Sequence, residues 1–160
     1  ELGLQSAPLL SDLGLAYLRV GETEAALATL TAATDLDPNN AQTHYARGLA
    51  LLYLGEYYMA SLEADWALSL QPDYVEALAV RATAYLNVGR WEEAVTDFQA
   101  AYSLDPAYID ALYGMAQAQV ALGRPWDAIA ALQTYLSIAP VSARNRSAAQ
   151  ALLDRLLTQY

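Results

Sequence analysis

Residues 89–106, GRWEEAVTDFQAAYSLDP, decide the fold because a related stretch recurs three more times at a fixed distance. Prolines close the four copies at positions 38, 72, 106 and 140, which lie 34 residues apart. A period of this length is typical of stacked helical units, each of which contacts only its neighbours, and not of a closed globule. The spacing therefore predicts a repeat array.

Glycine and proline divide each repeat into two helices. A glycine at position 21, 55, 89 or 123 separates two segments with apolar residues at helical spacing. We expect this glycine to end the first helix in the left-handed conformation, which glycine alone adopts without steric cost. The second helix should end at Leu36, Leu70, Leu104 or Ile138, because the following proline cannot continue it. The predicted units cover residues 7–40, 41–74, 75–108 and 109–142.

The two ends of the chain differ from the repeats. Residues 143–160 carry a stripe of alanine and leucine at helical spacing, which predicts a capping helix over the last unit. By the same 34-residue period, Leu2 falls where a second helix would end. We therefore expect residues 1–6 to be the tail of a preceding repeat or linker in a longer protein.

Small and large side chains alternate at fixed positions of the units. The first helices carry a large residue and, four positions later, a small one: Leu10, His44, Leu78 and Leu112, then Gly14, Gly48, Ala82 and Ala116. The second helices carry Ala26, Ala60, Ala94 and Ala128, then Leu30, Ala64, Phe98 and Leu132, and then Ala33, Ala67, Ala101 and Tyr135. A small residue lets two helix axes approach closely, while its large neighbours fill the flanking grooves.

With this pattern, residues 7–142 resemble tetratricopeptide repeats. The resemblance implies an all-α fold, a right-handed α-solenoid of helix-turn-helix repeats. It also implies a non-enzymatic scaffold whose concave face, lined by the first helices, binds a segment of another protein.

Composition narrows the classes of partner. The 18 acidic residues outnumber the 8 basic ones, all of which are arginine, and the net charge is −10. This balance argues against nucleic acid and against an anionic membrane surface, both of which need clustered cations. No apolar run approaches the roughly 18 residues of a membrane span, and no signal peptide is visible. The compartment is left open, with the cytoplasm favoured.

Residues with catalytic chemistry are few. The chain has no cysteine and one histidine, His44, at a position that is leucine in the other units, so we expect a packed ring. Glu92 and Glu93 lie where a second helix begins, and there they would meet the positive end of the helix dipole. No clustered metal ligands and no phosphate-binding loop occur. We therefore expect no cofactor, no metal and no catalysis.

The concave face is the predicted binding site. On the positions that the family's geometry assigns to this face, the predicted peptide-binding residues are Tyr45, Leu49, Tyr53, Glu76, Thr83, Asn87, Asp110, Tyr113 and Gln117. Such a groove is aromatic, partly apolar and neutral to acidic. It suits an apolar or neutral-to-basic peptide or helix that carries Arg or Lys. Alternatively, some of these side chains only pack between units.

One known type of ligand is disfavoured. Family members that clamp the C-terminal carboxylate of a chaperone peptide place Lys, Arg and Asn on the concave positions. Here those positions hold Ser11, Leu15, Leu49 and Glu76.

Two other functions stay open at this point. The chain could be a self-assembly module that stacks on another copy through its open N-terminal face, or through Tyr135 and the capping helix. It could also be the regulatory or targeting arm of a larger enzyme whose catalytic domain lies outside this sequence.

Overall fold

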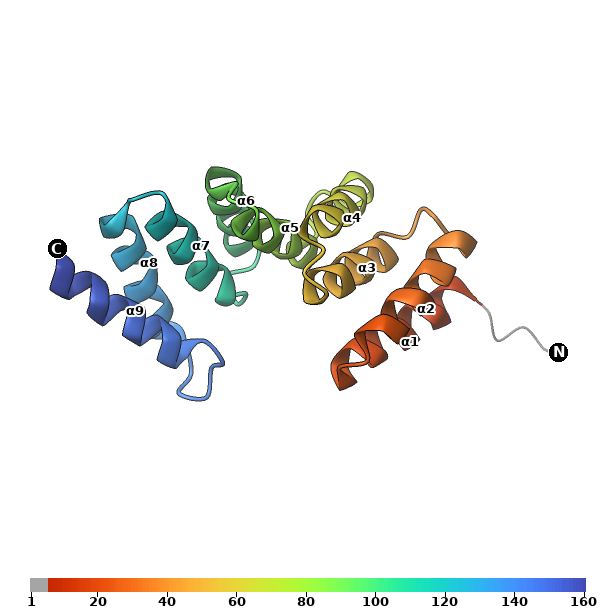
Figure 1. Ribbon diagram of the computed structural model, residues 1–160, viewed down its shortest axis with the longest axis horizontal. Coiled ribbons are helices and arrows are strands. Elements are labelled where there is room, and N and C mark those ends of the chain that lie inside the picture. The colour runs from red at the N-terminus through yellow and green to blue at the C-terminus, as the bar shows by residue number, and fades with distance from the viewer. Residues whose placement is uncertain (1–5) are drawn as a thin grey trace.

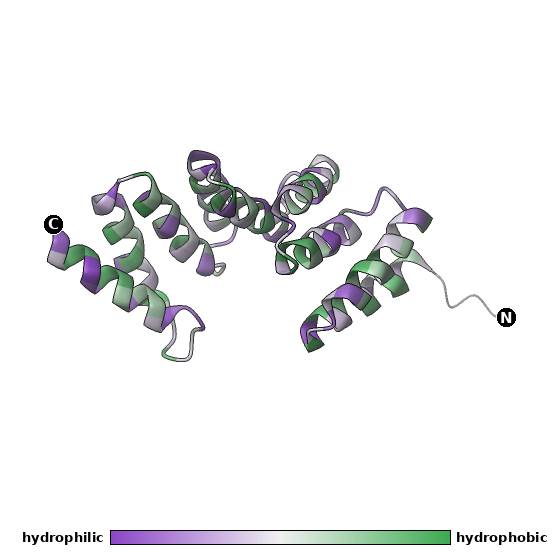
Figure 2. Cartoon of the chain, viewed as in Figure 1, coloured by the Kyte–Doolittle hydropathy of each residue, from purple (hydrophilic) through white to green (hydrophobic). Residues whose placement is uncertain are grey.

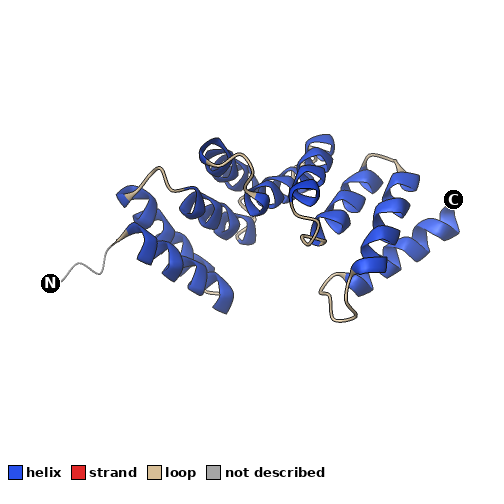
Figure 3. Cartoon of the chain, turned by 180° about the vertical axis from the view of Figure 1, so that it is seen from behind, coloured by secondary structure: helices blue, strands red, loops and turns tan. Residues whose placement is uncertain are grey.

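The computed structural model describes residues 6–160, and within that range it contains nine α-helices and no strand (Figure 3). The helices are α1 (Ala7–Val20), α2 (Thr23–Leu36), α3 (Ala41–Tyr53), α4 (Tyr57–Leu70), α5 (Val75–Asn87), α6 (Trp91–Leu104), α7 (Asp110–Ala121), α8 (Pro125–Ile138) and α9 (Arg146–Gln159). The predicted all-α solenoid is confirmed. The expectation for residues 1–6 falls on residues 1–5 outside the described range and on Ser6, which caps the start of α1, and the four unit boundaries stay a prediction.

The turns within the units form as the glycines predicted. Gly21, Gly55, Gly89 and Gly123 all have φ between 70° and 83°, and no other described residue has a positive φ. At Gly21 the backbone N–H donates to the carbonyl of Leu18, which closes the end of α1. Each second helix then starts within a few residues, antiparallel to the first.

In two of the loops between units, an aspartate beside the proline accepts a backbone hydrogen bond. Asp37 accepts a hydrogen bond from the Asn39 backbone N–H at 3.2 Å, and Asp105 accepts one from the Ala107 N–H at 2.9 Å. Such local bonds fix a tight turn around the proline between them. The second helices end at the four predicted residues.

The helices form two layers along an arch (Figure 1). The first helices α1, α3, α5 and α7 contact one another in series, and each also packs against the second helix of its own unit. Hydrophobic and hydrophilic positions alternate along the helices (Figure 2), so that each helix has a face to bury. Helices α1 and α9 lie at opposite ends of the arch (Figure 1).

Alanine occupies the closest helix crossings. Ala26, Ala60, Ala94 and Ala128 are fully buried, with 0% of their surface exposed. In the first unit Gly14 also lies close to the second helix, because a Cβ added to it would lie 2.4 Å from Cγ of Leu30. These crossings tolerate little additional volume.

Buried ion pairs join the two helices of the middle units. Arg47 on α3 binds Glu63 on α4, and 34 residues later Arg81 on α5 binds Asp97 on α6, with Nε to Oδ2 at 2.7 Å and Nη2 to Oδ1 at 2.9 Å. The hydrogen bonds to Asp97 raise the pKa of Arg81. A planar guanidinium bound to both carboxylate oxygens fixes the rotation of one helix about the other.

The close packing around Ala94, where α5 and α6 cross, predicts the effect of one substitution. Ala94→Leu should lower the free energy of unfolding by about 1–3 kcal/mol, because the larger side chain overpacks the α5–α6 contact. Urea denaturation followed by circular dichroism measures this loss. Ala28→Leu, on the exposed side of α2, is the control and should change stability by less than about 0.5 kcal/mol. Equal effects of the two changes would show that Ala94 does not lie at the crossing.

Candidate functional site

A cavity of about 360 Å³ opens between α3, α5, α7 and the loop before α9. The first helices expose to it the side chains that do not pack against the second helices. Six of the nine predicted site residues line it: Leu49, Tyr53, Thr83, Asp110, Tyr113 and Gln117. The structure therefore brings most of the predicted concave site together in one hollow.

The other three predicted residues lie outside this lining. Tyr45 packs against Tyr74, the residue before α5, with ring centroids 5.2 Å apart. Glu76 is exposed in the first turn of α5. Asn87 is exposed at the end of α5, where its amide donates to the Thr83 carbonyl at 2.8 Å.

Sequence reasoning missed the residues that the loops contribute. Tyr108, before α7, and Arg144 and Asn145, before α9, line the same cavity. The Asn145 amide donates to Asp110 Oδ1 at 3.1 Å and so ties the loop to the start of α7. The repeat pattern assigns only helix positions to the concave face, so it gave no signal for these three residues.

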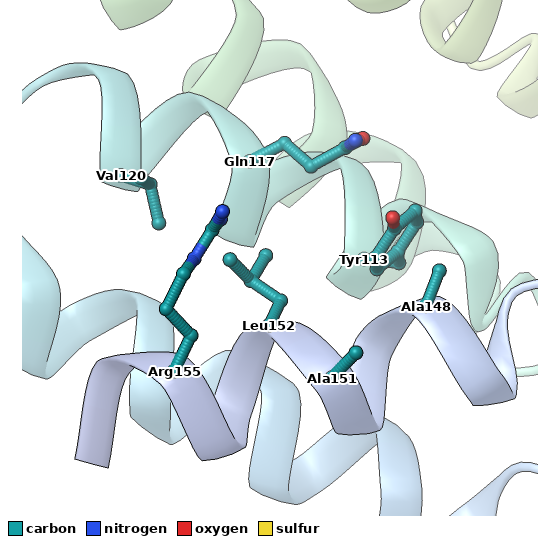
Figure 4. Close-up of a pocket in the computed structure, with 7 residues that line it drawn as sticks. All are labelled: Tyr113, Gln117, Val120, Ala148, Ala151, Leu152 and Arg155. Carbon is teal, nitrogen blue, oxygen red and sulfur yellow. The ribbon is translucent and has the colours of Figure 1, made fainter. Parts of the chain in front are cut away.

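A second cavity, of about 470 Å³, extends the hollow toward the C-terminus between α7 and α9 (Figure 4). It forms because α9 packs mainly on α8 and leaves a slot beside α7. Its lining is mostly apolar: Tyr113, Gln117, Val120, Ala148, Ala151, Leu152 and Arg155. Tyr113 and Gln117 border both cavities, so the two lie next to each other along α7, and together they are called the groove below.

Charge along this groove changes from one end to the other. Asp110 and Arg144 line the first cavity, and the exposed Glu76 lies outside the lining at the start of α5. Arg155 lines the second cavity, at the C-terminal end. Neither Arg144 nor Arg155 has an ion-pair partner among residues 6–160. In Figure 4 the Arg155 side chain extends from α9 toward α7.

Burial also changes the pKa of tyrosines in and beside the groove. Burial, with the nearby Tyr45, Asp110 and Glu76 as smaller causes, raises the pKa of Tyr108 to about 12. Burial and then Glu76 raise the pKa of both Tyr45 and Tyr74. Each of these phenols is therefore neutral at physiological pH and available as a hydrogen-bond donor.

His44 is packed, as predicted. Its ring is 5% exposed, its Nδ1 lies 2.9 Å from Glu63 Oε2, and its Nε2 lies 2.9 Å from the Pro38 carbonyl oxygen. Both ring nitrogens are thus occupied within the fold. His44 holds the end of α2 and its loop against α3 and α4.

One predicted self-assembly contact is wrong. Tyr135 is fully buried, at 0% exposure, with its ring centroid 6.1 Å from that of Tyr113. The large ring fills the space between α7, α8 and the following loop, and so this side chain cannot stack on another copy. Arg146 closes the end of the same helix by donating to the carbonyls of Leu136 and Ala139.

Among the described residues, no group of three or more His, Cys, Asp or Glu side chains is placed to hold a metal ion. None of the described helices is long and apolar enough to span a membrane.

Comparison with known proteins identifies the family. Three family profiles, described as tetratricopeptide repeat, TPR repeat and tetratricopeptide repeat, match residues 89–156, 14–55 and 45–109. Together the matches extend over most of the chain. The chain belongs to the tetratricopeptide repeat family. This is a protein-interaction fold, and the resemblance seen in the sequence is confirmed. No curated protein sequence matches the chain.

Solved tetratricopeptide repeat structures superimpose on the chain. The first TPR of Spaghetti (RPAP3), bound to the HSP90 peptide SRMEEVD, is 25% identical, with a TM-score of 0.70, and the match covers 77% of this chain and 99% of that one. The first TPR domain of human RPAP3 is 26% identical, with a TM-score of 0.70, and covers 73% and 92%. PilF of Pseudomonas aeruginosa is 23% identical, with a TM-score of 0.83, and covers 96% and 68%.

The raised pKa of Tyr108 predicts a stability loss in alkali. Its pKa is 10 unperturbed and about 12 in the fold, so the neutral phenol contributes stability that is complete below pH 10 and is lost as the pH rises through 12. Tyr108→Phe cannot ionise and should lose less stability over this range. Urea unfolding at several alkaline pH values, with the tyrosinate absorbance recorded in parallel, measures the difference. Tyr160→Phe, which changes an exposed ring, should follow the wild type.

Proposed function

We propose that this tetratricopeptide repeat protein is a non-enzymatic scaffold that binds a segment of another protein in the groove defined above. The observation that carries the proposal is that two neighbouring cavities share Tyr113 and Gln117. Together they run from α3 to α9, so they can hold an extended or helical segment and not only a single side chain. The same groove would serve an isolated scaffold or the targeting arm of a larger enzyme.

The lining indicates the chemistry of the partner. Tyr53, Tyr113 and Leu152 offer apolar and aromatic surface, which suits apolar side chains. Glu76 and Asp110 suit an Arg or Lys on the part of the segment that lies over α5 and α7. Arg144 in the first cavity and Arg155 in the second each add a position for a carboxylate, which the sequence pattern alone did not indicate.

These charges separate the chain from the relative that is bound to the HSP90 peptide SRMEEVD. Here the matching positions hold Ser11, which is buried, together with Leu15, Leu49 and the acidic Glu76. Instead of cations for the peptide carboxylates, these positions offer three neutral side chains and one carboxylate.

We therefore expect SRMEEVD to bind poorly. Its dissociation constant, measured by fluorescence anisotropy with a labelled peptide, should be at least about ten-fold weaker than that of an apolar peptide with one Arg or Lys selected from a display library. Comparable affinities would contradict the proposed partner chemistry. They would leave the groove itself as the binding site.

The position of the site is tested by variants of the groove. The double variant Tyr53→Ala, Gln117→Ala removes one exposed ring and the amide that borders both cavities, and neither change cuts into the core. Library-selected peptides should bind this variant at least about ten-fold more weakly, which corresponds to about 1.4 kcal/mol. The matched control is Trp126→Ala on α8, which removes an exposed ring away from the groove. Retained binding to the double variant, with loss in the control, would move the site to another face.

A further inference from the structure

Helix α4 presents a row of large apolar side chains to solvent. Tyr58 is 70% exposed, Met59 45%, Leu62 36% and Trp66 59%. Tyr58, Leu62 and Trp66 are spaced by four residues, which places them on one face of the helix. This face lies in the second-helix layer, and α4 occupies the upper edge of the arch in both views (Figures 1 and 3).

The repeat itself does not require this row. The positions of Tyr58, Leu62 and Trp66 recur in the other second helices, 34 residues apart, as Glu24, Ala28 and Ala32 in α2, Glu92, Thr96 and Ala100 in α6, and Trp126, Ala130 and Thr134 in α8. Three units thus keep small or polar residues at most of these positions and fold with the same helices. A contiguous exposed apolar patch that the fold does not need marks an interaction surface.

The carboxylates of α4 are neutralised from within the chain. Glu63 is buried and binds Arg47 and His44, and Asp65 binds Arg81, with Oδ1 2.7 Å from Nη1. Glu56, at the start of the helix, has no ion-pair partner among the described residues. Although the chain has a net charge of −10, a second copy can therefore approach this face with little like-charge repulsion. A basic partner would find few free carboxylates there.

The order of the side chains is symmetric about Leu62. An aromatic ring stands four residues before it and another stands four residues after it. When two such helices cross antiparallel at Leu62, Tyr58 of each copy meets Trp66 of the other, and the contact repeats itself around a two-fold axis. Rows of residues four apart interlock between helices at about −50°, which is the commonest packing angle.

Trp66 is already held in place. Its ring stacks on His44, with centroids 5.9 Å apart and planes inclined by 21°, and His44 is fixed by Glu63 and Pro38. A ring that is ordered before association loses less conformational entropy when a partner covers its free face.

We propose that the outward face of α4, formed by Tyr58, Met59, Leu62 and Trp66, is the interface of a symmetric dimer of this chain, in which the two α4 helices cross at Leu62. The contact goes beyond peptide binding, because the groove lies on the first helices and stays open in the dimer. It also differs from the predicted stacking through Tyr135 or the end of the array.

Sedimentation equilibrium of the purified chain tests the association. The wild-type mass should rise from one chain toward two as the concentration increases from about 1 to about 300 μM. The variant Tyr58→Glu, Leu62→Thr, Trp66→Ala carries the residues that α6 has at the same positions, and it should stay monomeric with an unchanged circular dichroism spectrum. Trp126→Ala, which removes an exposed ring from α8, should associate like the wild type. A wild-type chain that stays monomeric throughout would overturn the proposal. The exposed row on α4 would then be a binding surface for a different protein.

Cross-linking tests the symmetry without removing the interface. The natural chain has no cysteine, so a single introduced thiol reports one position. Leu62→Cys, at the proposed two-fold axis, should form a disulfide-linked dimer on mild oxidation, and Thr96→Cys, the same position on α6, should not. Equal cross-linking of the two variants, or cross-linking of Thr96→Cys alone, would refute the crossing at Leu62. This result stands even if the triple variant fails to fold.

Discussion

The close crossing of the two helices within each unit is the contact on which the rest of the molecule depends. A buried alanine such as Ala60 or Ala94 lets the helix axes approach, and the large side chains beside it then fill the grooves. Once the pair is fixed, its outer surfaces fit the next pair in only one way. Because the same contact recurs, a local constraint sets the course of the whole arch.

The repeat separates stability from function. The alanine at the crossing is the same in every unit, since each unit must satisfy the same crossing, although other buried positions differ, as Tyr135 does. Exposed positions also differ, and two groups of these differences lie on separate surfaces. On the first helices they produce the groove with Tyr53, Asp110 and Tyr113. On α4 they produce the row that contains Leu62 and Trp66. Departures from the repeat are therefore the best guide to where this chain meets other molecules.

The end of the array adds chemistry that the repeats lack. Helix α9 covers α8 but leaves a slot beside α7, and Arg155 reaches into that slot (Figure 4). The loop before α9 brings Arg144 and Asn145 to the groove. Thus the capping segment does more than shield an apolar face, because it changes the charge at one end of the groove.

Much of the fold follows from the sequence alone. The spacing of Gly89 and Pro106 and of their counterparts determined where helices begin and end, because backbone φ and the missing N–H of proline act locally. The period also indicated the family, and of the nine groove residues that the family's geometry predicted, six line the groove. Only the tertiary structure decided that Tyr45 packs on Tyr74, that Tyr135 is buried, and that Tyr108 and Arg144 reach the groove. These outcomes depend on how loops and neighbouring units pack in space, and a one-dimensional period carries no information about distances between them.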